Sequence, residues 1–145
     1  NVTSVRMARR LDFGNLQGER HYSLTSAYDR SKLALTLFTY ELARRLRGSG
    51  VTANCVHPGS LRTEIYRDLR GISGVLVRLA TPFLASPEVG ARRVVHAAAA
   101  PELEGVTEAY LVNCRPARST PGSYDLGLAA RLWTLSERMT GLAGD

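Results

Sequence analysis

The stretch AYDRSKLALTLFTYELARRLRGSGVTANCVHPG, residues 27–59, places a helical pattern directly before a strand-like one. Apolar residues recur at helical spacing, and we expect one helix from about Thr25 or Ser26 to Arg47, ended by the glycines that follow. The next run, 51–57, is short, contains β-branched residues and is bounded by glycine and proline, which predicts a buried strand. Because the helix is apolar on two sides, we expect other elements to pack against both of them.

The same alternation continues in both directions along the chain. Residues 1–5 predict the end of a strand, and later segments predict a helix over about 86–100, a strand over 108–114 and a last helix over roughly 125–140. Strands that alternate with helices imply a parallel sheet with right-handed crossovers. We therefore predict an α/β fold, a partial doubly wound, Rossmann-like parallel sheet of three strands. Three strands are few for such a sheet, so residues 1–145 are interpreted as the carboxyl-terminal part of one domain whose amino-terminal half is missing.

Composition and charge exclude several classes of function. The 145 residues are 44% hydrophobic and 22% charged, as in globular proteins. The net charge is +6, but the arginines are scattered and no aromatic residues interleave with them, so no nucleic-acid partner is expected. No run of about 18 apolar residues predicts a membrane span. Cys55 and Cys114 lie in apolar runs and are interpreted as free buried thiols in a reducing, cytoplasmic location, and no residue spacing suggests a metal site.

Polar residues of several predicted elements are expected to meet at one edge of the sheet. In parallel α/β sheets, ligands bind outside the carboxyl ends of the strands. Ser4 ends the first predicted strand, and residues 57–59 end the second. Tyr28 and Lys32 lie in the first two turns of the helix that leads away from the same edge. The sequence therefore predicts a site that combines a hydroxyl, a phenol, an ammonium and a glycine-containing loop.

Lys32 is the only lysine among 19 basic residues, and it follows Tyr28 by one helical turn. A free phenol titrates at about 10, too high for efficient acid–base catalysis at neutral pH. A cation one turn away favours the phenolate and lowers that pKa. A compact ammonium can also donate to ligand hydroxyls, which suits lysine better than arginine, and Ser4 could hold a substrate oxygen beside the phenol. The set favours proton transfer coupled to hydride transfer, although a tyrosine and a lysine at this spacing are also ordinary helix-surface neighbours.

The ordered set of motifs resembles the short-chain dehydrogenase/reductase family, and within it the retinol-dehydrogenase-like branch, over nearly the whole chain. YDRSK (28–32) resembles the family's Tyr-x-x-x-Lys motif, NVTS (1–4) its strand end with the catalytic serine, and HPGSLRT (57–63) its Pro-Gly loop. The resemblance implies NAD or NADP as the cofactor and an alcohol or carbonyl as the substrate. It assigns catalysis to Ser4, Tyr28 and Lys32, and cofactor binding to Tyr28, Lys32, His57, Pro58, Gly59 and Thr63.

Some family features have no counterpart in these 145 residues. They are the glycine-rich turn, the Asn-Asn-Ala-Gly segment and the asparagine of the catalytic tetrad, all of which would lie before Asn1. Asn54 lies in the wrong predicted element to replace that asparagine. The chain therefore resembles the carboxyl-terminal half of an NAD(P)-dependent oxidoreductase, a half expected to be inactive alone. The alternative is a truncated, non-catalytic remnant or an interaction module on the same fold, and a homo-oligomer is left open.

The remaining predictions concern the substrate and His57. The segment 65–85 has apolar residues at helical spacing, broken by glycine and proline, and we interpret it as a substrate lid rather than a membrane-touching helix. An apolar substrate is expected for that reason. His57 is given a structural role in its loop in preference to acid–base chemistry. The lid residues expected to line the entrance are Ile72, Val75, Leu76, Leu79 and Phe83.

Overall fold

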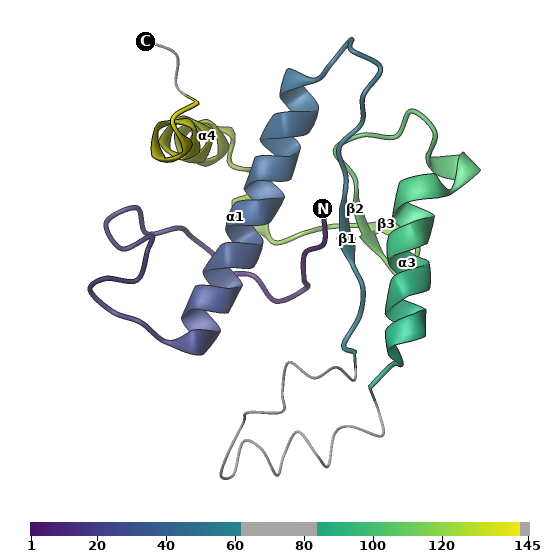
Figure 1. Cartoon of the computed structure of the whole chain (residues 1–145), viewed down its shortest axis with the longest axis horizontal. Coiled ribbons are helices and arrows are strands. Elements are labelled where there is room, and N and C mark those ends of the chain that lie inside the picture. Colours follow the sequence, from purple (N-terminus) through teal and green to yellow (C-terminus); the bar gives the residue numbers. More distant parts are fainter. Residues whose placement is uncertain (62–83, 143–145) are drawn as a thin grey trace.

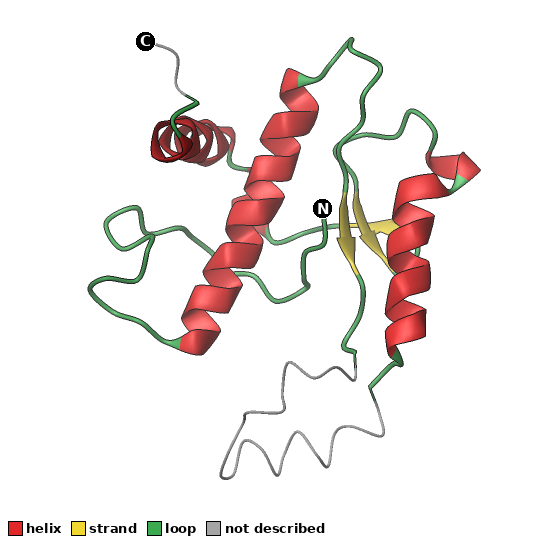
Figure 2. Cartoon of the chain, viewed as in Figure 1, coloured by secondary structure: helices red, strands yellow, loops and turns green. Residues whose placement is uncertain are grey.

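The structure, a computed structural model, describes residues 1–61 and 84–142. In this part of the chain, helices alternate with short strands, as the sequence predicts (Figure 1, Figure 2). The elements are α1 (Leu24–Arg45), β1 (Cys55–His57), α3 (Pro87–Ala99), the 3₁₀ turn η3 (Pro101–Leu103), β2 (Tyr110–Val112), β3 (Arg115–Ala117), the 3₁₀ turn η4 (Pro121–Tyr124) and α4 (Leu126–Thr140). The predicted α/β class is confirmed, and the three long helices of the described chain fall within a few residues of their predicted bounds.

The small sheet has the order β1-β2-β3, and the first residues of the chain extend it beyond β1. β1 and β2 are parallel, with Val56 opposite Leu111. On the other side of β1, Val2 forms a parallel bridge with Val56. The Val56 amide donates to the Asn1 carbonyl at 2.9 Å, and the Thr3 amide donates to the Val56 carbonyl at 2.8 Å, as between paired strands. The first predicted strand is thus present as a single bridge.

An antiparallel edge strand, β3, was not predicted. Asn113 and Cys114 both have positive φ, 51° and 62°, which is the backbone of a two-residue hairpin turn. The turn ends β2 at Val112 and sends β3 back beside it in antiparallel register. All three residues of β3 are exposed, and its sequence has no alternation of apolar and polar residues that would predict a strand. The sheet is therefore mixed rather than wholly parallel.

Helix α1 is packed on two sides, as its two apolar faces predict. On one side Leu33 and Leu37 are fully buried against Ala129 and Leu132 of α4. Tyr40, seven residues after Leu33 and therefore on the same face, packs against the sheet residues Cys55 and Tyr110. On the other apolar face, Phe38 stacks on Trp133 of α4. Figure 1 shows α1 and α3 on opposite sides of the sheet. The helix begins earlier than expected, because the Ser23 hydroxyl accepts from the Ser26 amide and so caps it.

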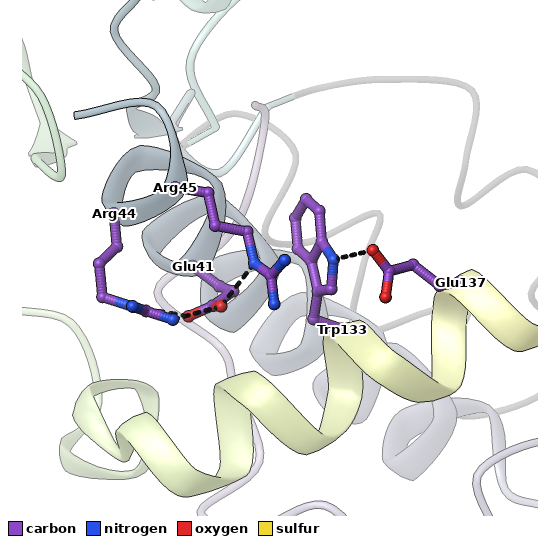
Figure 3. Close-up of polar contacts among 5 residues, drawn as sticks. All are labelled: Glu41, Arg44, Arg45, Trp133 and Glu137. Carbon is purple, nitrogen blue, oxygen red and sulfur yellow. Dashed lines mark hydrogen bonds and ion pairs between the residues drawn. The ribbon is translucent and has the colours of Figure 1, made fainter. Parts of the chain in front are cut away.

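A polar and aromatic cluster joins the carboxyl end of α1 to α4 (Figure 3). Glu41 is buried, and its carboxylate accepts hydrogen bonds from Arg44 and Arg45. The Arg45 guanidinium lies 4.4 Å from the ring centre of Trp133, which also stacks on Phe38 at 5.2 Å. The stacking and the cation–π contact fix α4 against α1 in addition to the apolar core.

Both cysteines lie within the described residues and can be compared with the prediction. Cys55 and Cys114 are free, and Cys55 is buried as expected, whereas Cys114 is only partly buried because it lies in the hairpin turn. No group of His, Cys, Asp and Glu side chains in residues 1–61 and 84–142 could hold a metal ion. Among the same residues, no helix is long and apolar enough to cross a membrane.

Candidate active site

Tyr28 and Lys32 lie together in the first turns of α1, where the first residues of the chain cross the helix. The Lys32 Nζ is 5.5 Å from the centre of the Tyr28 ring, and the tyrosine is 38% exposed. The same ammonium donates to the Val2 carbonyl at 3.4 Å, which is near the outer limit for a hydrogen bond. Lys32 thus lies between the phenol and the backbone of residues 1–4, with part of the Tyr28 ring open to solvent.

Thr3 brings Ser4 to the same turn of α1. The Thr3 hydroxyl donates to the Lys32 carbonyl at 3.2 Å and is 2.9 Å from the hydroxyl of Thr36. Ser4 is buried beside it, and its Oγ accepts from the Arg6 amide at 3.1 Å. Among the described residues, the Ser4 hydroxyl accepts this bond and is not seen to donate one. The structure therefore places Lys32 beside the Tyr28 ring and ties Thr3, the residue before Ser4, to the backbone of Lys32; the shared site of Ser4, Tyr28 and Lys32 stays a prediction.

The loop that follows β1 begins at the carboxyl edge of the sheet, with Pro58 and Gly59. Gly59 has a φ of +104°, a conformation that favours glycine because it has no Cβ. The Pro58 carbonyl accepts from the Arg93 guanidinium of α3 at 2.8 Å. Burial lowers the pKa of His57, and the nearby charge of Arg93 lowers it further, so the imidazole is neutral at neutral pH. His57 is the last residue of β1, opposite Val112, and the structural role expected for it stays a prediction.

One predicted cofactor-binding residue and the predicted lid residues cannot be compared with the structure. Thr63 and the lid residues of segment 65–85 lie outside the described residues. Asn54, which precedes β1, lies within the described residues. Its side-chain amide bonds to the backbone that leads into β2: Nδ2 donates to the Val106 carbonyl, and Oδ1 accepts from the Ala109 amide. It holds β1 beside β2 and stays away from the ligand edge, as its position in the sequence indicated.

The described residues fit one end of a dinucleotide. The space over Gly59 is occupied by the Arg93 guanidinium. The groups offered near the start of α1 are therefore a partly exposed phenol and an ammonium held only by a weak hydrogen bond. These groups suit a nicotinamide and its ribose hydroxyls. In residues 1–61 and 84–142, no strand leads through a glycine-rich turn into a helix, which is the usual site for a pyrophosphate.

Sequence reasoning missed two residues that shape this site. Thr3 fastens the first strand to α1, but a single hydroxyl at a strand end gives no signal of its partner. Arg93 reaches the loop from 35 residues further along the chain. Its position on the predicted helix was visible, whereas the direction of its side chain depends on how α3 crosses β1.

Comparisons with known proteins show which family this sequence resembles. Residues 14–71 match the family model for short chain dehydrogenase. Human retinol dehydrogenase 14 is 38% identical over 135 residues, covering 91% of this chain and 40% of that protein. Human retinol dehydrogenase 12 is 39% identical over 143 residues, covering 98% and 45%. Mouse polyprenol dehydrogenase is 43% identical over 141 residues, covering 92% and 41%.

A solved structure shares the fold. The crystal structure of an uncharacterized protein from Mycobacterium paratuberculosis superposes with a TM-score of 0.66 at 29% identity, covering 97% of this chain and 48% of that chain. The fold therefore defines a Rossmann-like α/β protein. The chain belongs to the short-chain dehydrogenase/reductase family and is retinol-dehydrogenase-like in sequence. It spans less than half the length of these relatives.

Proposed function

We propose that this chain carries the proton-transfer site of an NAD(P)-dependent oxidoreductase that interconverts an apolar alcohol and its carbonyl compound. The observation that carries the proposal is the position of Lys32, whose ammonium lies 5.5 Å from the Tyr28 ring and also contacts the segment that ends in Ser4. Membership of an oxidoreductase family supports the reaction type. The choice between NAD and NADP stays open in this proposal.

The three residues divide the binding and the proton transfer between them. The nicotinamide, when bound, would exchange a hydride with the carbonyl carbon. In the direction of reduction, Tyr28 gives its phenolic proton to the substrate oxygen and becomes a phenolate. The Lys32 ammonium stabilises that phenolate by its charge and offers further donors to the ribose hydroxyls. Ser4 donates its hydroxyl proton to the substrate oxygen and so holds it beside Tyr28. Oxidation runs through the same contacts in reverse.

The apolar character of the substrate is supported by the relatives. Retinol and polyprenol, the alcohols in their names, are both apolar. A panel of alcohols and carbonyls from short and polar to long and apolar tests this part. Preference for small, charged compounds would contradict it. A homo-oligomer and a cytoplasmic location stay predictions from the sequence.

The reaction is tested in a chimera in which residues 1–145 replace the matching part of human retinol dehydrogenase 12. We expect reduced nicotinamide to be consumed with an apolar carbonyl substrate. Tyr28→Phe should lower turnover by about 10²- to 10⁴-fold, the usual contribution of a general acid. Tyr22→Phe, at an exposed tyrosine just before α1, is the matched control and should leave turnover unchanged. A chimera that binds NADP but reacts with no member of the panel would favour the non-catalytic alternative.

A further inference from the structure

The loop after β1 is tied to the start of α3 by contacts that do not depend on any ligand. The amide of Ala85 donates to the Ser60 carbonyl at 3.0 Å, beside a parallel bridge between Leu61 and Ala85. The Leu61 side chain packs so closely on Gly90 that a Cβ there would lie 2.3 Å from its Cδ1. These contacts fix the far end of the loop. Its near end, Pro58 and Gly59, is held in a different way.

Arg93 holds the near end through one hydrogen bond and one close approach. Proline has no N–H, so the Pro58 carbonyl is the only backbone group through which that residue can be anchored. It accepts from Nη1 of Arg93 at 2.8 Å. The same nitrogen lies over Gly59, where a Cβ would be only 2.1 Å away. The guanidinium therefore occupies the space that any side chain at residue 59 would need.

We infer that Arg93 is a positioning residue, whose guanidinium locks Pro58 and Gly59 into the conformation that faces the ligand edge of the sheet. The lock has two interdependent parts. Arg93 can reach the carbonyl only because residue 59 has no side chain, and Gly59 keeps its positive φ while the carbonyl before it is fixed. The consequence for a cofactor rests on the proposed function, whereas the lock itself is a property of the 145-residue chain.

The first experiment measures the charge of Arg93 at its neighbour His57. Burial and Arg93 both lower the pKa of His57. Nuclear magnetic resonance titration of the imidazole should therefore show a higher pKa in Arg93→Met and a still-lowered one in Arg93→Lys, which retains the cation. Arg92→Met, at an exposed arginine on the same helix, is the matched control and should leave the titration unchanged. A His57 pKa unaffected by Arg93→Met would overturn the placement of the guanidinium.

The second experiment tests whether the two parts of the lock are coupled. Gly59→Ala should push the guanidinium off the Pro58 carbonyl. This single substitution should therefore already abolish the hydrogen bond that Arg93→Met removes. In thermal unfolding, the double variant Gly59→Ala with Arg93→Met should be no less stable than Gly59→Ala alone. Losses that simply add would show that the residues act independently, and would overturn the interlock.

The third experiment addresses ligand binding and uses the retinol dehydrogenase chimera. Because Arg93 acts on the loop rather than on the proton, Arg93→Met should raise KM for the nicotinamide cofactor by about tenfold or more while kcat changes less. Arg93→Lys should recover part of the loss, and Arg92→Met should behave as wild type. Equal loss in kcat with an unchanged KM would overturn the role in cofactor positioning. A wild-type chimera without activity would refute the proposed function, and the titration and unfolding results would then decide the lock alone.

Discussion

Replacing Glu41 by glutamine should destabilise the fold more than replacing it by leucine. The Glu41 side chain is fully buried, and its two oxygens accept from Arg44 Nε at 2.9 Å, Arg44 Nη2 at 2.5 Å and Arg45 Nε at 2.7 Å. Glutamine keeps the shape but offers one oxygen, and it turns an NH₂ group toward guanidinium donors. Hydrogen bonds to charged groups contribute about 1.5–3 kcal/mol each, and an unmatched buried donor costs about 1–3 kcal/mol.

The size of the loss is limited by the arginines. Their side chains are 42% and 41% exposed, so both guanidinium groups can turn toward water once the carboxylate is gone. We therefore expect Glu41→Gln to lower the free energy of unfolding by about 2–3 kcal/mol rather than by the sum of three bonds. Glu41→Leu leaves no buried polar group at this position, and the partly exposed arginines keep their hydration instead of becoming buried unpaired charges. We therefore expect it to cost less than Glu41→Gln, about 1 kcal/mol.

Urea unfolding followed by tryptophan fluorescence measures both variants. Trp133 is the only tryptophan, and it stacks on Phe38 under the Arg45 guanidinium, so its emission reports the α1–α4 contact directly. The comparison requires equal slopes of free energy against urea in all three proteins. A leucine variant that is as unstable as the glutamine variant, or less stable, would refute the reasoning from unmatched donors.

Four further outcomes are expected. Lys32→Arg in the chimera should lose most of the turnover although charge is kept, because a planar guanidinium cannot replace the compact ammonium; near-normal turnover would contradict its role. Glu41 is buried, which raises its pKa, but the arginine hydrogen bonds outweigh this and lower it, and the pKa of His57 is lowered too. The stability that each group contributes should be fully present above its unfolded pKa, about 4.3 for glutamate and about 6.5 for histidine, and should be lost as the pH falls through its lower pKa in the folded protein. Acid unfolding curves of Glu41→Leu and His57→Gln, each compared with wild type, would show this. Residues 1–145 alone should bind NAD or NADP no more tightly than about 1 mM, or about 4 kcal/mol, in calorimetry; micromolar affinity would mean that the chain builds a phosphate site in another way. Val2 is 42% exposed at the outer edge of the sheet, so the chain should self-associate with increasing concentration and Val2→Lys should weaken this in ultracentrifugation; unchanged association would place the contact elsewhere.

The sequence predicted those parts of the fold that depend on local patterns. Helix α1 follows from apolar spacing and terminating glycines, and the Tyr28–Lys32 pair follows from one helical turn. Both need no knowledge of distant residues. The predicted start at about Thr25 or Ser26 is one or two residues late, because Ser23 caps the helix and α1 begins at Leu24. Helix ends are set by single hydrogen bonds, which propensity alone does not resolve.

Features that depend on distant partners escaped prediction for a physical reason. The strand expected over 51–57 begins only at Cys55, because the preceding backbone bonds to the 106–109 connection: the Ala53 amide donates to the Thr107 hydroxyl, and the Glu108 amide donates to the Ala53 carbonyl. The antiparallel β3 depends on two non-glycine residues in left-handed conformations. Its sequence, Arg-Pro-Ala, carries no strand pattern. Such features become visible only when the partner segments are in place.

The hydrogen bond between Lys32 and Val2 explains how the site can be ordered and still receive a ligand. At 3.4 Å the contact is long, so it holds the ammonium near Tyr28 with little energy. Ribose hydroxyls that accept from Nζ at shorter distance would replace it without first breaking a strong bond. Thr3 keeps the strand on α1 through the Lys32 carbonyl and Thr36, so the backbone stays in place when the ammonium turns away. The anchoring of the strand and the chemistry of the lysine are therefore carried by different atoms of the same residue.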